Sequence, residues 1–470
     1  MDTKPLERFA TQARRDLLSS VDARATSVLA AGSVARAERP EVVRKLEAEI
    51  NAHGREHVID KVAYTWFNRI IALRFMDARG YTDAGIVSPA QGQSHGQPEI
   101  LTEAKRGNLD SDVVDDKPAA ETILSLLDGT RRSTDAEGEA YAFLLTEYCR
   151  FWHRSMPFIF EREGDYTELL VPAGLLADGA ILSRAREVLT EEVCGDVEVI
   201  GWLYQFYIAE RKDEVFAGFK KNKKAGADEI PAATQLFTPH WIVRYLVENS
   251  LGRLWLLNHP DSKLAQQMDY YVASIDVETD FLKIDRPEDL RVVDPAVGSG
   301  HMLTYAFDLL YAIYEERGYA PSGIPGLIIE HNLHGIEIDP RAGSLAAFAL
   351  TMKAAARRKL FLKNPVQPHI CILESLHFDQ GDLDYLWSLS KGISVARTDF
   401  DAFWNAFEHA NTFGSLIQPT ADLVPWLKPL VDDLETAGNL LAGIARKVID
   451  QSEVLSQRYG AVVANPPLHG

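Results

Sequence analysis

Residues that could bind a small ligand lie close together at 291–303, a stretch written RVVDPAVGSGHML. A short apolar run ends at Asp294, two glycines follow, and a run with helical spacing comes next. Glycine tolerates backbone torsions barred to other residues and lets a ligand approach the main chain. The first N–H groups of a helix have no partner inside it. A carboxylate before such a turn favours a ligand that carries an amino group.

This turn lacks two familiar phosphate-binding patterns. It contains neither the Gly-x-Gly-x-x-Gly of dinucleotide folds nor the Gly-Lys-Ser/Thr of phosphate loops, so phosphate binding is not the natural interpretation. The plain alternative is a strand–turn–helix connection with no ligand. If the turn binds a ligand, the candidate residues are Asp294, Ala296, Gly298 and Gly300.

Two more acidic residues follow the next apolar run, in the stretch GIEIDPRA at 335–342. Glu337 would lie at the tip of a strand, where folds of parallel strands bind ribose hydroxyls. A carboxylate can accept both hydrogen bonds of a diol, so we predict that Glu337 binds ribose. We expect Ile338 to pack on a base and Asp339 to cap the following helix.

The chain ends in AVVANPPLHG, an apolar run that leads into Asn465, Pro466, Pro467 and Leu468. The pattern predicts a buried strand followed by a loop. Proline restricts the backbone and removes an N–H donor, so two prolines in a row stiffen this loop. The loop is either a site of chemistry or only a turn.

The elements that position these residues alternate from about residue 230 onward between short β-branched runs and helical runs. Such alternation predicts an α/β domain with a parallel sheet. Residues 378–458 have helical patterns and predict an insertion before the last strand. The predicted strands are 290–293, 333–337, 370–373 and 461–464.

Residues 1–230 predict a mostly helical N-terminal domain, followed by the α/β domain at 231–470. In 60–80, apolar side chains recur near helical spacing, and Gly80 can end the helix. Residues 85–118 are polar and contain Gly and Pro, which predicts an extended loop.

The composition is that of a globular protein, with 46% hydrophobic and 25% charged residues among 470. No apolar run is long enough for a membrane span, and the three scattered cysteines suit a reducing cytoplasm. The net charge of −19 argues against nucleic-acid binding over the whole surface. The basic segments 220–224 and 353–359 are candidate local contacts, although a solvated loop and a charged helix face explain them more simply.

Four motifs, in order along the chain, together resemble the N6-adenine DNA methyltransferases. The stretches at 291–303 and 335–342 resemble that family's S-adenosylmethionine site, and TQLFTPHWIV at 234–243 resembles its Phe-Thr-Pro motif. Asn-Pro-Pro at 465–467 resembles the catalytic loop. Ile-Leu-Glu-Ser-Leu at 372–376 resembles the segment whose acidic residue contacts the cofactor adenine. The resemblance implies a Rossmann-like methyltransferase sheet, with Phe237, Thr238, Pro239 and Glu374 as further cofactor-binding residues.

The resemblance also implies a mechanism at the last motif. The side-chain oxygen of Asn465 and the carbonyl of Pro466 would accept both hydrogens of an adenine amino group and orient it for methyl transfer. The adenine must be flipped out of double-stranded DNA, which costs a few kcal/mol. The family's aromatic residue after the prolines stacks on that base, worth roughly 1–3 kcal/mol. Leu468 takes this position here and has no π-face. No metal is needed.

The helical N-terminal region, with residues 197–216 before the Phe-Thr-Pro motif, is similar to the BREX phage-resistance methyltransferases of the PglX type. This implies a cytoplasmic, phage-defence protein that modifies DNA and acts with other defence proteins. Fused methylase–nuclease enzymes share the core but begin with a nuclease domain, and we find no convincing Asp…Glu-x-Lys arrangement in 1–230, which argues against an endonuclease.

Two other functions stay open. One is a non-catalytic, cofactor-binding subunit of a defence complex, favoured by Leu468 and by a sheet with fewer strands than the family's. The other is a protein-glutamine N-methyltransferase, which also uses Asn-Pro-Pro. Ending after the fourth strand would expose a long apolar edge. We therefore expect these 470 residues to be the N-terminal part of a longer chain, with 468–470 as a junction.

Overall fold

The computed structural model covers the 470-residue chain, and the description below leaves out residues 1, 91, 94–95, 161, 220–237, 275–276, 391–394 and 467–470, together with the side chains of 213–219. The chain divides into two compact units, Met1–Glu210 and Arg211–Gly470. The division falls within α9 (Glu198–Phe219). The predicted boundary between 230 and 231 lies outside the described residues, so the predicted domain limits stay a prediction.

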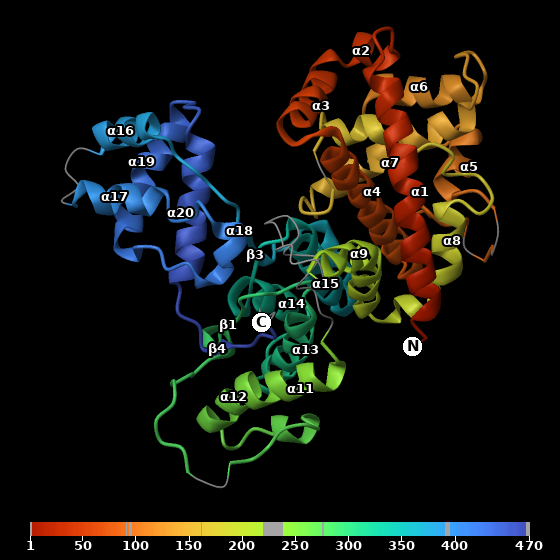
Figure 1. Cartoon of the computed structure of the whole chain (residues 1–470). Helices are drawn as coiled ribbons and strands as arrows, with labels where there is room; N and C mark the ends of the chain where they lie inside the picture. Colours follow the sequence, from red (N-terminus) through yellow and green to blue (C-terminus); the bar gives the residue numbers. More distant parts are fainter. Residues whose placement is uncertain are drawn as a thin grey trace. The chain divides into compact units, whose positions relative to one another are not determined.

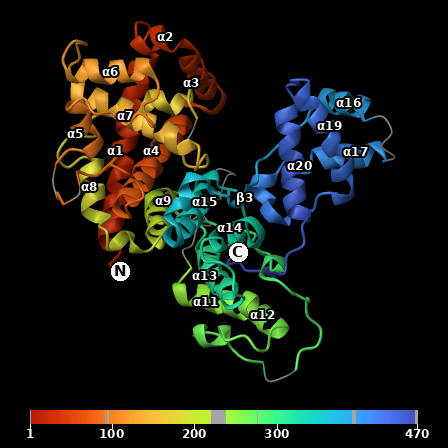
Figure 2. The same cartoon turned by 180° about the vertical axis from the view of Figure 1, so that it is seen from behind.

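The first unit is built from helices, drawn in red to yellow-green (Figures 1 and 2). α1 packs against α4 and α8, and α6 packs against α7. The helices are α1 (Lys4–Leu29), α2 (Val34–Glu38), α3 (Pro40–His53), α4 (Arg55–Ala78), α5 (Glu99–Lys105), α6 (Lys117–Leu127), α7 (Ala136–His153), α8 (Ile181–Val188) and the first part of α9, with 3₁₀ turns η1 (Tyr166–Leu170) and η2 (Val193–Gly195).

The helix α4 confirms the helical spacing read in 60–80. Apolar side chains bury it over most of its length, and the indole N–H of Trp66 donates to the carbonyl of Thr167 at 3.2 Å. Gly80 follows with φ of +64°, a conformation that glycine adopts at little cost. The N–H of Tyr81 then bonds to the carbonyl of Met76 at 2.9 Å, which ends the helix where the sequence predicts.

The predicted extended loop at 85–118 is wrong in part, because α5 lies within it. The carboxylate of Asp77 accepts the N–H groups of Val87 and Ser88 at 2.8 and 2.9 Å and turns the chain back on itself. This partner lies outside the polar stretch, so the composition of 85–118 does not reveal it.

In the second unit, the described residues form one parallel sheet with strand order β3-β2-β1-β4. β2 and β3 are added in turn on one side of β1, and β4 then pairs on the other side. Ligands in such sheets bind where this reversal separates the loops at the carboxyl ends of the strands. The strands are β1 (Val292–Asp294), β2 (Leu333–Glu337), β3 (His369–Ile372) and β4 (Ala461–Val462). The predicted strands are confirmed, although β4 is two residues shorter than expected.

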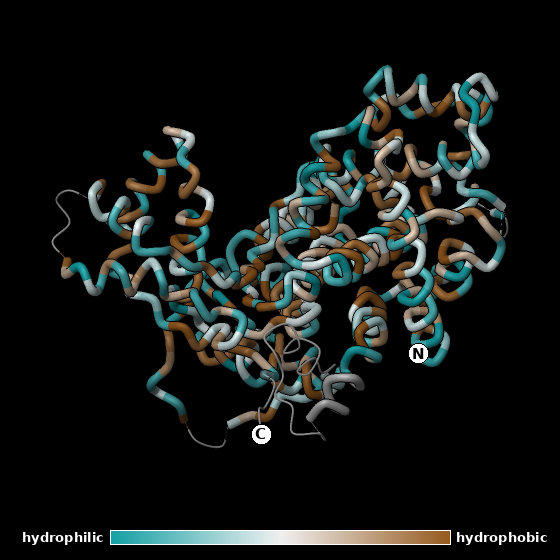
Figure 3. Tube along the Cα trace, turned by 45° about the horizontal axis from the view of Figure 1, so that its top comes forward, coloured by the Kyte–Doolittle hydropathy of each residue, from teal (hydrophilic) through white to brown (hydrophobic). Residues whose placement is uncertain are grey.

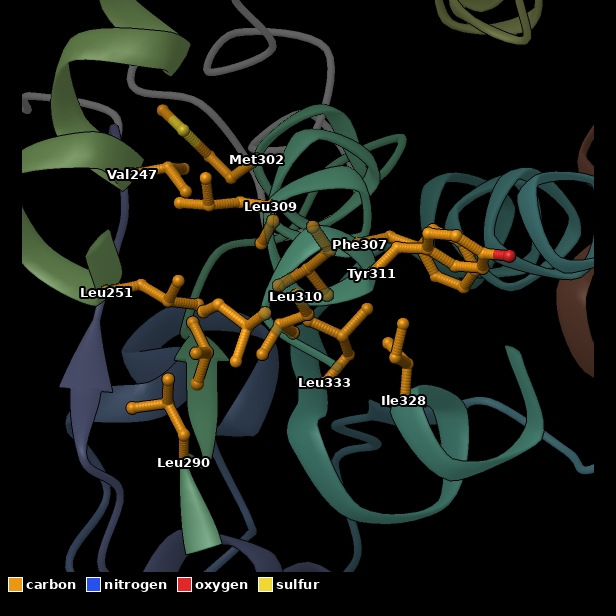
Figure 4. Packing of buried hydrophobic residues seen from close by; sticks show 14 of the residues in the cluster. Val247, Leu251, Leu290, Met302, Phe307, Leu309, Leu310, Tyr311, Ile328 and Leu333 are labelled. Atoms are coloured by element: carbon orange, nitrogen blue, oxygen red, sulfur yellow. The ribbon is translucent and has the colours of Figure 1, made fainter. Parts of the chain in front are cut away.

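Two hydrophobic cores lie on opposite faces of this sheet, as strand alternation requires. On one face, Val292 and Leu333 pack with residues of α13 (His301–Glu316) and α15 (Pro340–Arg357). Figure 4 shows this core, with Leu290 and Leu333 opposite Leu310. On the other face, Val293 and Ile336 pack against the helices of the segment between β3 and β4.

The remaining elements connect and cover the strands (Figure 1). Before β1 come α11 (His240–Val247), the π-helical turn η4 (Glu248–Gly252), α12 (Arg253–Asn258), η5 (Leu264–Gln267) and η6 (Pro287–Asp289); between strands lie α14 (Ile324–Leu327), η7 (Ile328–Asn332) and η8 (Lys359–Lys363). The segment predicted as a helical insertion contains α16 (Gln380–Leu389), α17 (Arg397–Trp404), α18 (Ala410–Phe413), η9 (Gly414–Leu416), η10 (Ala421–Leu423), α19 (Val424–Thr436) and α20 (Ala442–Ser456).

Hydrophobic and hydrophilic segments alternate along the helices of both units (Figure 3). Among the described residues, the structure contains no helix with the length and apolar character that a membrane crossing needs.

Candidate active site

The glycine turn joins β1 to α13 at the carboxyl edge of the sheet. Asp294 ends β1 and is 2% exposed, and its Oδ1 accepts the N–H of Ala296 at 3.1 Å. Gly298 and Gly300 have φ of +55° and +90°, which side chains rarely tolerate. A Cβ on Gly300 would lie 3.0 Å from the Cα of Ala346, so α15 closes tightly against this turn.

Glu337 ends β2 and binds the glycine turn from its neighbouring strand. Its Oε2 accepts the N–H of Gly298 at 2.8 Å, and its Oε1 accepts the N–H groups of Ile338 and Asp339 at 2.9 and 3.0 Å. A carboxylate offers about four acceptor positions. The sequence predicts a carboxylate that accepts two ribose hydroxyls, whereas these backbone bonds leave acceptor capacity for about one.

Glycine at 335 lets the turn pack on β2. A Cβ at Gly335 would lie 2.7 Å from Ile370 and 3.0 Å from Val297. The N–H of Val297 donates to the carbonyl of Ile336 at 3.0 Å, so the turn is also hydrogen-bonded to the strand. The two carboxylates are thus held by the backbone of adjacent strands.

Burial controls the charge of this pair. It raises the pKa of Asp294 to about 7, helped by the negative charge of Glu337 and opposed by the Ala296 hydrogen bond. Burial also raises the pKa of Glu337, against the pull of its backbone hydrogen bonds. A nearby positive charge would stabilise the ionised forms of these two buried carboxylates, so the site suits a cationic ligand.

The residues after Glu337 have separate roles. Asp339 caps α15, because its Oδ1 accepts the N–H of Arg341 at 3.0 Å, which confirms the predicted cap. Ile338 is half-buried and packs against the core of the inserted helices, near Gly414. Its predicted contact with a base stays a prediction.

The last motif meets the Thr-Pro motif across the sheet edge. β4 pairs with β1, and the N–H of Val463 donates to the carbonyl of Val293 at 3.0 Å. This places the loop after β4 beside the end of β1. There the Nδ2 of Asn465 donates to the Oγ1 of Thr238 at 3.1 Å, and Thr238 is buried.

Pro239 precedes the first turn of α11 as its N-cap, and Pro466 is exposed. Phe237, Pro467 and Leu468 lie outside the described residues.

Glu374 contacts the inserted helices. Its carboxylate forms an ion pair with the Nζ of Lys447 at 2.6 Å, and its N–H donates to the side chain of Gln451. Both partners lie on α20. The Glu374 side chain is 48% exposed, so it stays accessible to a ligand.

The basic segment at 353–359 is largely engaged within the protein. Lys353 and Arg357 form ion pairs with Asp308, and Arg358 donates to the carbonyl of Ser322 at 3.0 Å. The segment 220–224 lies outside the described residues. Within the described part of the chain, no group of three His, Cys, Asp or Glu side chains is placed to hold a metal.

One set of residues near the site was missed by sequence reasoning. Glu248 is fully buried and bonds to Arg244 and Tyr305, while Arg244 also reaches Asp269 and Glu248 also accepts the N–H of Tyr270. We call these five residues the Glu248 cluster. Its one sequence signal is the four-residue spacing of Arg244 and Glu248, which places both on one helix face.

A parallel sheet with a glycine turn, two buried carboxylates and an Asn-Pro loop bonded to a Thr-Pro motif is the arrangement expected of an adenine methyltransferase core. No family model matches the chain. It is 35% identical over 538 aligned positions to the adenine-specific methyltransferase BrxX of Escherichia coli O9:H4 (strain HS). It is 31% identical over 530 positions to the adenine-specific methyltransferase PglX of Lacticaseibacillus casei (strain Zhang).

Both alignments cover 100% of this chain and 43% of the relative. The chain therefore spans less than half the length of these curated relatives. The resemblance to PglX-type adenine-specific methyltransferases, predicted from the motifs and the helical N-terminal region, is confirmed along the whole chain.

Proposed function

We propose that this chain carries the cofactor-binding and methyl-transfer residues of a site-specific DNA adenine-N6 methyltransferase of a BREX phage-defence system. The observation that carries the proposal is the hydrogen bond between Asn465 and Thr238. It joins the two motifs that the reaction needs, beside the strand that ends at Asp294. The names of the two relatives support the reaction, and the strand order supports a Rossmann-like methyltransferase sheet.

The residues fit S-adenosylmethionine, which combines a sulfonium, an amino group, a ribose and an adenine. Buried Asp294 and Glu337 suit its positive charge and its hydroxyl groups. When bound, the cofactor supplies the methyl group. The residues proposed to hold it are Phe237, Thr238, Pro239, Asp294, Ala296, Gly298, Gly300, Glu337, Ile338 and Glu374.

Asn465 would act on the adenine amino group. Because its Nδ2 donates to Thr238, the other side of the amide, Oδ1, is directed away from Thr238 and offered as an acceptor. Oδ1 and the carbonyl of Pro466 would each accept one N6 hydrogen, which draws the nitrogen lone pair out of conjugation with the ring. No strong base is needed before attack, since the proton leaves only after nitrogen has become cationic.

The substrate would be double-stranded DNA with one adenine flipped out. With Leu468 in place of an aromatic residue, part of the stacking energy of roughly 1–3 kcal/mol per base must come from elsewhere. Since Lys353, Arg357 and Arg358 already have protein partners, DNA contacts would lie mainly outside this segment. We also propose a cytoplasmic location and other phage-defence proteins as partners.

The experiment measures transfer of a tritiated methyl group to duplex DNA by the protein at the length its host makes, together with calorimetric cofactor binding. We expect Asn465→Ala to lower transfer about 100-fold, in the range seen when an electrostatic contact to the reacting group is removed. Its cofactor affinity should change little. The matched control is Asn364→Ala, because Asn364 is also exposed but lies after η8.

Three outcomes would contradict the proposal. Equal transfer by wild type and Asn465→Ala would remove Asn465 from the chemistry. Label found in protein and not in DNA would favour a protein-glutamine N-methyltransferase. Cofactor binding without any transfer would favour the non-catalytic subunit. The names of both relatives favour neither alternative.

A further inference from the structure

The Glu248 cluster is a charged network around one buried carboxylate, and the proposed reaction does not use it directly. Glu248 lies in the π-helical turn η4 and is 0% exposed. Its Oε1 accepts the hydroxyl of Tyr305 at 2.6 Å and the Nε of Arg244 at 3.2 Å, and its Oε2 accepts the N–H of Tyr270 at 2.6 Å. Pairing and hydrogen bonding of this kind offset the cost of burying a carboxylate.

Arg244 extends the network and ties it to a third segment. Its Nη2 donates to the carboxylate of Asp269 at 2.7 Å. Its guanidinium also lies over the rings of Tyr270 and Tyr305, at 5.1 and 5.6 Å from their centroids. The cluster thus links α11, the loop after η5 and α13 through directional contacts.

The linked helices are the two that begin at the candidate active site. α11 starts directly after Thr238 and Pro239, and α13 starts directly after Gly300 of the glycine turn. Their first turns are neighbours, since the rings of His240 and His301 are 6.3 Å apart. Tyr305 is one turn into α13, and its ring meets that of His240 edge-on at 6.0 Å.

Apolar packing alone would only weakly fix the position of α11 along α13. Val247 and Leu251 face Met302, Leu309 and Leu310 in Figure 4, but hydrophobic contact is non-directional. Hydrogen bonds have narrow limits of distance and angle. The Glu248 cluster supplies such directional contacts between α11 and α13.

We propose that Glu248, Arg244 and Tyr305 are positioning residues for methyl transfer. They hold α11 against α13. This keeps Thr238 in the position where its hydroxyl oxygen accepts a hydrogen bond from the Asn465 side-chain amide. This inference rests on the proposed function, since it assigns a role in that reaction to residues that join α11 to α13. A shift of about 1 Å in such a contact can lower a rate by up to 100-fold.

The test compares two tyrosine-to-phenylalanine variants on one helix. Tyr305→Phe removes the hydroxyl that bonds to Glu248. Tyr314→Phe, the matched control, removes a hydroxyl that donates to Asn332 at 3.0 Å, away from α11. Each variant loses one hydroxyl group from α13, and Tyr305→Phe should lower Tm somewhat more, because its hydroxyl bonds to charged Glu248 and Arg244.

We expect only Tyr305→Phe to lower kcat for DNA methylation, by about tenfold, with less than a threefold change in KM for the cofactor. Hydrogen exchange of the α11 amides should be faster in Tyr305→Phe than in wild type and unchanged in Tyr314→Phe. Equal loss of kcat in both variants, or unchanged exchange of α11 in Tyr305→Phe, would overturn the positioning role. A wild-type protein that transfers no methyl group would refute the proposed function and the catalytic role together, whereas normal transfer by Tyr305→Phe would overturn only the positioning role.

Discussion

Asn465 and Thr238 are joined by a hydrogen bond of 3.1 Å although 227 positions separate them in the chain. Asn465 follows β4, the last strand of the described sheet, and Thr238 precedes α11, which comes before the first strand. Their contact exists because β4 pairs directly with β1, which brings the end of the chain back to the start of the α/β unit. The structure therefore brings the two motifs into direct contact.

Thr238→Val should test this bond, because valine keeps the shape of threonine and removes the hydroxyl. We expect kcat for methyl transfer to fall about tenfold, since the Asn465 amide loses the partner that fixes its orientation. Thr351→Val is the control, as Thr351 is fully buried and its hydroxyl donates within α15 to Ala347 at 2.8 Å. Single-turnover kinetics would measure the effect, and equal rates for the two variants would contradict it.

Gly300→Ala should destabilise the protein more than Gly318→Ala. Both glycines have positive φ, +90° and +81°, so both alanine variants bear a cost of roughly 1–2 kcal/mol. Only at Gly300 would the new Cβ meet another backbone, 3.0 Å from Ala346, whereas no atom lies within 4 Å at Gly318. Overpacking adds roughly 1–3 kcal/mol. Denaturant unfolding measures the difference, and equal losses of unfolding free energy would show that α15 moves enough to accommodate the new Cβ.

The raised pKa of Asp294, about 7, predicts how stability depends on pH. An unfolded aspartate titrates near pH 4. Between about pH 4 and 7 the folded protein therefore holds a proton that the unfolded chain has lost, and this residue's contribution to stability falls as pH rises. Asp294→Asn should remove that part of the fall. Unfolding free energies at pH 5 and pH 8 would show it as a smaller loss of stability in the variant.

The same residue predicts the pH dependence of cofactor affinity. Above about pH 7 the carboxylate is charged and attracts a cationic ligand, and below that pH it is largely neutral. We expect wild type to bind S-adenosylmethionine about tenfold more tightly than Asp294→Asn at pH 8, and the two affinities to converge at pH 5.5. Calorimetry at both pH values would measure this, and a constant ratio would exclude the carboxylate charge as the cause.

Glu374 offers a prediction with its own control. If its carboxylate contacts the cofactor adenine, Glu374→Ala should weaken cofactor binding several-fold. Lys447→Ala removes the same exposed ion pair but keeps the carboxylate, so it should not weaken binding. Both variants should change stability by less than about 1 kcal/mol, as for exposed ion pairs generally. Equal affinities for the two variants would assign Glu374 only to its pairing with α20.

Local pattern was enough to predict many elements of the structure. The helical spacing in 60–80 and the stop at Gly80 depend on neighbours in the chain, and both are found in α4. The four strands and the cap at Asp339 were predicted for the same reason. The helix α5 was missed because its segment is polar and contains Gly and Pro, and because contacts such as that of Asp77 with Val87 come from outside the segment.

The sequence by itself determined which residues have the chemistry for this site: the carboxylates at Asp294 and Glu337, the glycines between them, and the amide of Asn465. Only the tertiary structure decided how they are used. Strand order joins Asn465 to Thr238, and strand pairing lets Glu337 accept the backbone of Gly298. Burial sets the pKa of Asp294, and packing of α11 on α13 creates the Glu248 cluster. These contacts join residues far apart in the chain, so they depend on how whole elements pack, which no local spacing records.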